Sequence, residues 1–447
     1  MSTGAAAITH ARVLKIALPI VLSNATVPLL AAVDPGVVGQ LGDAVPIGAV
    51  AVGGITLTAI YWMFGFLRMG TTGLTANAVG AGQSHEVAAL LTRALLIAFA
   101  AGLALIALQF PIFWAAFSLS PASAEVEALA RQYMAIRIWS APAAIAVYGI
   151  TGWLIAQERT RAVLVVQLVM NGMNMGLDVL FVLGFDWGVP GVAVATFLSE
   201  WAGCLVGLWL CRAAFRVPAW RDWPRVFDRA RLIRMAVVNR DILIRSLLLE
   251  IILVSFVYFG SDFGDVQLAA NQVLTQFTFI TAYAMDGFAF AAEAFVGQSL
   301  GRGDRAGLRR GAVMTSIWGF AICVVLALVF WIFGGAIVDL MAKSVPVRAA
   351  ARDYLPWMVA APILGCASWM FDGIFIGAAR SRDMRNMMAI SFVIYGLAVW
   401  ALVPLFGNHG LWMALLISFV ARGVTLGLRY PALEASAGSP AAGGQGG

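Results

Sequence analysis

The feature that most constrains the fold is a series of long apolar segments that recurs along the chain. Each segment has 21 to 35 residues, and an α-helix needs about 20 to cross a hydrocarbon core of roughly 30 Å. Backbone polar groups find no water there, so spanning segments of this length must be helical. The twelve predicted transmembrane helices cover residues 14–41, 48–79, 91–117, 129–156, 162–184, 189–213, 238–260, 266–300, 309–333, 350–379, 386–406 and 409–429.

Composition excludes an ordinary soluble protein, because 61% of the 447 residues are hydrophobic and only 12% are charged. The net charge of +6 does not indicate a nucleic-acid partner, because the arginines are concentrated in short loops between apolar segments. The predicted class is an all-α polytopic membrane protein whose surroundings are a lipid bilayer.

The distribution of basic residues predicts the orientation. A strongly basic linker occupies residues 214–237, and further arginines lie in the loops 157–161, 301–310 and 380–385. All of these lie on the side shared with both termini, whereas most loops on the opposite side lack Lys and Arg. The exceptions on that side are Lys343, Arg348 and Arg352. The positive-inside rule therefore predicts cytoplasmic termini.

An internal repeat is visible at a spacing of about 221 residues. The turn Gly80-Ala-Gly82 corresponds to Gly301-Arg-Gly303, and Gly152 corresponds to Gly373. Each half contains six predicted helices, an even number, so both halves enter the membrane from the same side and form parallel repeats. Two such lobes suit alternating access.

The repeat predicts four regions. An N-lobe covers residues 1–213, the basic linker residues 214–237, a C-lobe residues 238–429, and a disordered tail residues 430–447, where bulky apolar residues are scarce.

The first apolar segment combines a carboxylate, Asp34, with Pro19, Pro28 and Pro35. An Asp near the bilayer centre costs about 2.5–3.5 kcal/mol on insertion scales, so it requires a partner or a proton. Prolines free backbone carbonyls and bend a helix. We therefore predict a moving helix with hinges at Pro28 and Pro35 and a protonatable Asp34. The alternative is an acid that faces a water-filled vestibule.

The fifth segment carries Asn171, Asn174 and Asp178 at positions i, i+3 and i+7, on one face of a helix. If Asp34 and Asp178 lie together, their repulsion favours keeping one of them protonated. This pattern predicts a proton site. The alternative is a helix–helix hydrogen-bond seam that never titrates.

The second half has its own acids at membrane depth, which are candidate cation or substrate ligands. They are Glu250, Asp286, Glu293 and Asp372. Asn171 and Thr196 in the first half are candidates for the same role. Arg68 and Arg137 in the first half are candidate counter-ions, although the sequence does not assign their partners. Aromatic and Met residues at the same depth could line a chamber for bulky amphiphilic cations.

The sequence offers no pattern for catalysis, metal binding or a cofactor. The three histidines form no HExxH, no GxSxG or Walker A occurs, and the four cysteines have no zinc-like spacing. We therefore expect neither an enzyme nor a metal site. A purely structural scaffold would not explain repeated buried acids, so a transporter is the preferred class.

Several motifs resemble a known family. The run VPLLAAVDPGVVGQLGD at 27–43 is similar to the first-helix motif of the multidrug and toxic compound extrusion (MATE) transporters. Residues 66–74, 239–249, 281–298 and 372–386 resemble the DinF branch in particular. The resemblance implies two six-helix lobes and efflux of small-molecule drugs or toxic metabolites, driven by H⁺ or Na⁺. It also implies a bacterial inner-membrane location, and we expect a monomer.

The family's proton-linked network carries over onto Asp34, Asn174 and Asp178, with Thr196 a weaker match. The acids of sodium-coupled relatives correspond to Asp372 and Glu250. Pro35 and Gln40 depart from the family pattern of the first helix. The DinF resemblance favours H⁺. The alternatives are Na⁺ coupling and a lipid-linked-precursor flippase, whose cationic cavity would not suit the acids retained here.

Overall fold

In the computed structural model, the described residues are 7–40, 43–119 and 123–438, without the side chains of residues 29, 31, 32, 34, 35 and 119. Twelve helices of this part are long and apolar enough to cross a membrane. They follow the predicted order, so the predicted all-α polytopic class is confirmed.

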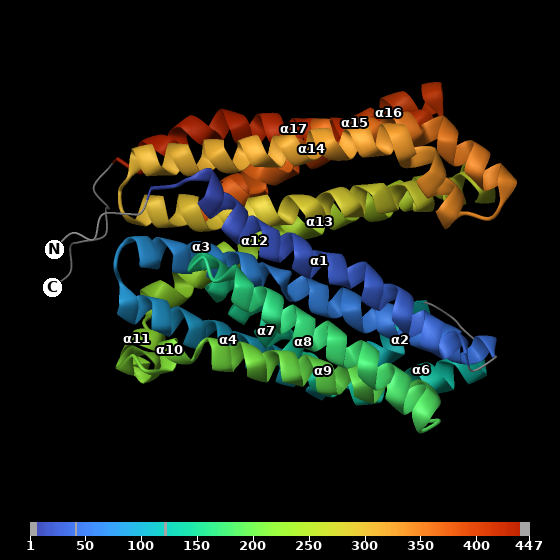
Figure 1. The fold of residues 1–447 in the computed structure, drawn as a ribbon, viewed down its shortest axis with the longest axis horizontal. Helices are drawn as coiled ribbons and strands as arrows, with labels where there is room; N and C mark the ends of the chain where they lie inside the picture. Colours follow the sequence, from blue (N-terminus) through green and yellow to red (C-terminus); the bar gives the residue numbers. More distant parts are fainter. Residues whose placement is uncertain (1–6, 41–42, 120–122, 439–447) are drawn as a thin grey trace. The chain divides into compact units, whose positions relative to one another are not determined.

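The first six spans are built from α1 to α9 (Figure 1). Their bounds are α1 His10–Gly39; α2 Ala44–Trp62, η1 Met63–Gly65 and α3 Phe66–Gly80; α4 Ser84–Ala107, followed by α5 Gln109–Leu119; α6 Ala124–Arg137, η2 Ile138–Ser140 and α7 Ala141–Ala156; α8 Thr160–Asp178 and η3 Val179–Gly184; and α9 Gly188–Leu210.

A short helical linker and six long helices complete the chain. The linker contains α10 Arg212–Phe215, η4 Pro218–Arg221 and α11 Trp223–Val226. The later spans are α12 Arg229–Ser261, α13 Asp265–Gly301, α14 Arg305–Met341, α15 Val345–Gly377, α16 Ser381–Phe406 and α17 Asn408–Ser436.

The repeat extends to the backbone. Helices α2, α4, α6 and α8 begin 221 residues before α13, α14, α15 and α16, respectively. The turns correspond as well, since Gly82 and Gly303 have φ of 70° and 71°, and Glu158 and Ala379 have φ of 60° and 53°. A positive φ is uncommon for residues other than glycine, so its recurrence at 158 and 379 indicates a shared local structure.

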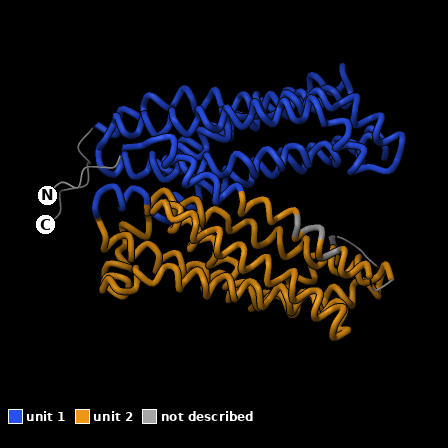
Figure 2. Tube along the Cα trace, viewed as in Figure 1, with its two compact units in different colours: residues 1–21, 76–82, 234–447 blue, residues 22–75, 83–233 orange. Residues whose placement is uncertain are grey.

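The chain divides into two compact units that do not coincide with the predicted lobes (Figure 2). Unit 1 contains residues 1–21, 76–82 and 234–447, and unit 2 contains residues 22–75 and 83–233. The start of α1 and the end of α3 therefore belong with the second half of the chain.

Close backbone contacts within unit 1 explain why the end of α3 belongs there. A Cβ atom on Gly80 would lie 2.0 Å from the carbonyl oxygen of Gln298, and one on Gly301 would lie 2.0 Å from that of Asn77. The Asn77 side chain also donates to the carbonyl of Gly377 at 2.9 Å. Glycine is required at both crossings, because any side chain would force these helices apart.

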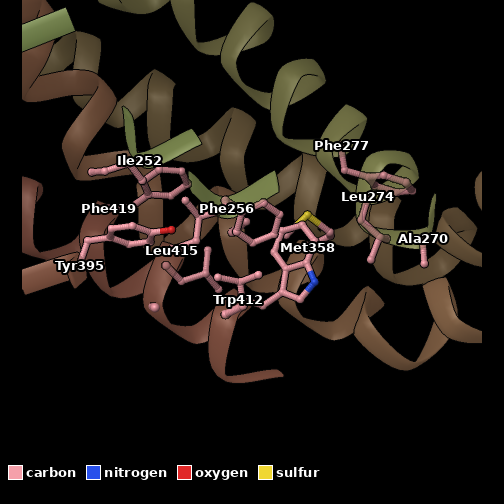
Figure 3. Packing of buried hydrophobic residues seen from close by; sticks show 14 of the residues in the cluster. Ile252, Phe256, Ala270, Leu274, Phe277, Met358, Tyr395, Trp412, Leu415 and Phe419 are labelled. Carbon is pink, nitrogen blue, oxygen red and sulfur yellow. The ribbon is translucent and has the colours of Figure 1, made fainter. Parts of the chain in front are cut away.

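Each unit has its own apolar core. In unit 1, Phe256 and Trp412 meet edge to face at a centroid distance of 4.5 Å, and Leu274, Phe277 and Met358 belong to the same cluster (Figure 3). In unit 2, the core residues come from α1, α2, α5 to α7, α9 and η3, and from the intervening η2. The polar residues described below are thus held by close-packed helices.

Large apolar side chains also cover the outside of the helices. Phe110 and Trp400 are each 78% exposed, and Leu340 is 87% exposed. Such exposure would be costly in water over so many residues, whereas lipid tails solvate these side chains.

The end of α17 corrects the predicted tail. The helix continues to Ser436, although residues from 430 onward were predicted to be disordered. Leu433 is buried, and Glu434 accepts a hydrogen bond from Arg305 at 3.1 Å. These contacts hold one further helical segment. Residues 439–447 lie outside the described part.

The basic linker is folded against α4. The buried Arg93 donates to the carbonyls of Val226 at 2.9 Å and Arg225 at 2.6 Å. Its third contact is an ion pair with Glu86 at 2.6 Å, and Glu86 also pairs with Arg231. Helix α12 begins at Arg229, within the predicted linker of 214–237. A single buried guanidinium thus organises the linker's end.

Candidate functional site

The predicted polar residues of the fifth span form a buried hydrogen-bonded group with α9. The Asn174 amide donates to Asp178 Oδ2 at 3.1 Å and to Thr196 Oγ1 at 3.4 Å. The Thr196 hydroxyl in turn donates to the carbonyl of Val192 at 3.1 Å. Asp178 is fully buried, and Asn174 is only 3% exposed. The carboxylate therefore depends on protein dipoles, not on water, for its stabilisation.

The backbone changes from α-helix to π-helix directly after Asp178. Helix α8 ends at Asp178, and the six residues that follow, Val179–Gly184, form a π-helix. Stacking of Phe181 on Trp187, with ring centroids 4.9 Å apart, packs the end of this segment. π-helical turns are rare and occur often at functional sites. No residue pattern in the sequence predicted this turn.

Helix α1 is joined to α8 at Asn171, which lies one turn before Asn174 and two turns before Asp178. Asn171 donates to Thr26 Oγ1 at 2.6 Å, and Thr26 donates to the carbonyl of Ser23 at 2.7 Å. The predicted hinge residue Pro28 lies within α1, which is helical to Gly39. The side chains of Asp34 and Pro35 lie outside the described part, so their predicted roles remain predictions.

A second buried charge group in unit 2 includes a residue that the sequence analysis missed. Arg137 pairs with Glu200 of α9 at 3.4 Å and donates to Tyr133 at 3.2 Å. Tyr61 donates to the carbonyl of Arg137 at 3.2 Å. Glu200 lies inside the apolar segment 189–213, and that position was the signal that could have identified it.

In the second half, Asp372 is held between two arginines. It pairs with Arg245 of α12 and lies 3.7 Å from the guanidinium of Arg422 of α17. Arg422 also donates to Ser368 at 2.9 Å. All three charged residues are at most 8% exposed. A cation at Asp372 would have to displace or tolerate two buried positive charges.

The other predicted acids of the second half occupy different environments. Glu293 is buried on α13, whereas Glu250 and Asp286 are half-buried. Within the described residues, no group of three or more acidic, His or Cys side chains is arranged to hold a metal ion. These acids remain candidate cation or substrate ligands.

Together, these features define a class of protein. It is a polytopic helical membrane protein with a six-helix repeat and buried carboxylates in each half. The MatE family profile matches residues 19–180 and 242–400. These ranges cover more than half of the chain, so the protein belongs to the MatE family.

Individual relatives agree with this membership. The chain is 36% identical to the Escherichia coli protein named DNA damage-inducible protein F over 418 residues, which cover 92% of this chain and 90% of that protein. It is 26% identical to the probable multidrug resistance protein NorM of Xanthomonas campestris, with 93% and 92% covered. The predicted MATE resemblance and its DinF-like branch are confirmed.

The fold agrees as well. A crystal structure of the Vibrio cholerae MATE transporter VcmN in its bent form matches with a TM-score of 0.83 at 19% identity, covering 96% of this chain and 97% of that chain. The fold shared with this structure is that of MATE transporters.

Proposed function

We propose that the protein is a secondary active efflux transporter that expels amphiphilic, cationic drugs or toxic metabolites in exchange for H⁺ by alternating access. The observation that carries the choice of H⁺ is the buried group of Asn174, Asp178 and Thr196. The substrate class rests on family membership and on relatives named multidrug resistance proteins.

The composition of the buried group favours a proton over sodium. One carboxylate, one amide and one hydroxyl are enough to hold a proton on Asp178 and to hydrogen-bond both of its protonation states. A sodium ion requires several converging oxygens, whereas the Asn174 amide directs its N–H groups at Asp178 and Thr196, and the Thr196 hydroxyl oxygen already accepts one of them. Asp372 is engaged with two arginines, which disfavours sodium there too.

The register of α1 supports a role for Asp34 in the same site. Residue 34 lies eight residues beyond Thr26, about 12 Å along the helix, and Asp178 lies seven residues beyond Asn171, about 10 Å along its own. Spans one and five run in the same direction, and Thr26 contacts Asn171. Residues 34 and 178 therefore lie at similar depth.

The proposed mechanism links protonation to the shape of α1. Two ionised carboxylates at one depth repel each other in a medium that screens poorly, and binding one proton removes this repulsion. Bending of α1 at Pro28 and Pro35 would respond to that change and open or close the substrate path. A gradient of one pH unit supplies about 1.4 kcal/mol per proton, enough for a tenfold drug gradient at one-to-one exchange.

The test is transport in everted membrane vesicles, with a pH gradient or a sodium gradient imposed separately. We expect drug movement with the pH gradient alone, its collapse with a protonophore, and its loss in Asp178→Asn. The matched control is Asp186→Asn, an exposed acid in the loop after the π-helix that should transport normally. Transport that follows a sodium gradient at fixed pH would overturn the proposal.

A further inference from the structure

Unit 1 contains a strongly basic cavity of about 890 Å³ among the starts of α12 and α16 and the end of α17. Six arginines and two acids, Asp241 and Asp383, line it, so the lining carries four net positive charges. The arginines are Arg234, Arg240, Arg380, Arg382, Arg385 and Arg429. A cavity of this charge is suited to an anion.

The two acids are already paired inside the cavity. Asp241, which is 1% exposed, contacts Arg385 at 2.7 Å and Arg240 at 3.0 Å. Asp383 lies 3.8 Å from Arg380. These pairs fix the shape of the cavity and neutralise only part of its charge.

Three guanidinium groups are left for a ligand. Within the described residues, Arg234, Arg382 and Arg429 have no acidic partner, and all three are exposed. Helix α16 begins at the same place with 26 residues and no side-chain cap on its first N–H groups. Its dipole and free N–H groups add to the attraction for an anion.

The cavity also borders the apolar surface of the same helices. Val237, which lines it, is 39% exposed, and Leu428, next to Arg429, is 75% exposed. Val424, one turn before Leu428 in α17, is 56% exposed. A ligand that places its anionic part among the arginines would therefore extend naturally along lipid-facing side chains.

We propose that this cavity binds the phosphate headgroup of an anionic phospholipid, with its acyl chains against α12 and α17. Guanidinium groups bind phosphate oxygens in pairs and match this ligand well. Basic pockets between transmembrane helices on the cytoplasmic side are suited to such headgroups, and the positive-inside rule predicts that side here. The bound lipid joins three helices of unit 1 and stabilises their packing.

The experiment uses the full-length protein in a neutral detergent. Its thermal unfolding midpoint is measured with phosphatidylglycerol, with phosphatidylcholine and with inorganic phosphate, at equal ionic strength. Native mass spectrometry counts retained lipids. We expect a midpoint rise of several degrees and retained lipid with phosphatidylglycerol only. The apparent lipid affinity should fall at least tenfold in the double variant Arg382→Gln, Arg429→Gln.

The matched control is Arg161→Gln with Arg310→Gln, which removes two exposed arginines near the starts of α8 and α14, outside the cavity. It should retain the full response. Equal stabilisation by phosphatidylcholine, or an unchanged response in the cavity variant, would overturn the proposal. Reproduction of the effect by inorganic phosphate alone would assign the cavity to a soluble anion instead. These readouts do not involve transport, so they are independent of the proposed efflux function.

Discussion

Replacing Asp372 with Asn tests whether this acid serves structure or ion coupling. The change preserves shape but leaves the buried Arg245 and Arg422 without their counter-ion. At an effective dielectric constant of 20, attraction across the 3.7 Å between Asp372 and Arg422 is about 4 kcal/mol before desolvation. Breaking one partner of a buried pair costs about 3–5 kcal/mol, because the other charge remains buried. We expect Asp372→Asn to destabilise the protein by that amount.

The measurement is unfolding in detergent micelles, followed by tryptophan fluorescence. It compares Asp372→Asn, Arg422→Gln and the double variant that carries both changes. Because the second change removes one of the stranded charges, the double variant should be less unstable than the singles predict, with a coupling of roughly 1–3 kcal/mol. The matched control is Asp353→Asn, an exposed acid on the same helix α15. It should change stability by less than about 0.5 kcal/mol.

A structural role for Asp372 also predicts the transport result. Folded Asp372→Asn should remain driven by the pH gradient, with impaired drug binding or packing. If the variant is as stable as the Asp353 control and its transport changes in sodium dependence, Asp372 is an ion ligand. The assignment of coupling to the first half would then be wrong.

Arg93→Gln should lose the charge-assisted hydrogen bonds to the linker, at roughly 1.5–3 kcal/mol for each, and trypsin should then cleave residues 216–231 faster than in the wild type; an unchanged digest would show that Arg93 does not hold the linker. Asp34→Asn should insert normally but lose gradient-driven efflux, and wild-type efflux in that variant would remove Asp34 from coupling. Burial raises the pKa of the Cys211 thiol to about 12, more than Arg159 lowers it. A variant with Cys211 as its sole cysteine should therefore resist maleimide at pH 8 until it is unfolded, and rapid labelling of the native state would contradict the burial.

The sequence alone determined the class of protein, the number of spans and the repeat. These properties depend on segment length, apolar content and spacing within the chain, which need no knowledge of tertiary contacts. The face shared by Asn174 and Asp178 was also predictable, because helical periodicity relates residues four positions apart, and their hydrogen bond has this spacing.

Only the tertiary structure decided which charges meet. Arg137 pairs with Glu200 across 63 positions and Arg245 with Asp372 across 127, distances over which no local pattern holds. The π-helix after Asp178 and the attachment of the α3 end to unit 1 likewise depend on neighbouring helices. An isolated charge in a membrane must find a partner, so the sequence requires that each buried arginine and carboxylate be matched. Helix packing determines which residues pair, because the attraction between two charges weakens as their separation increases, and only the folded chain sets that separation.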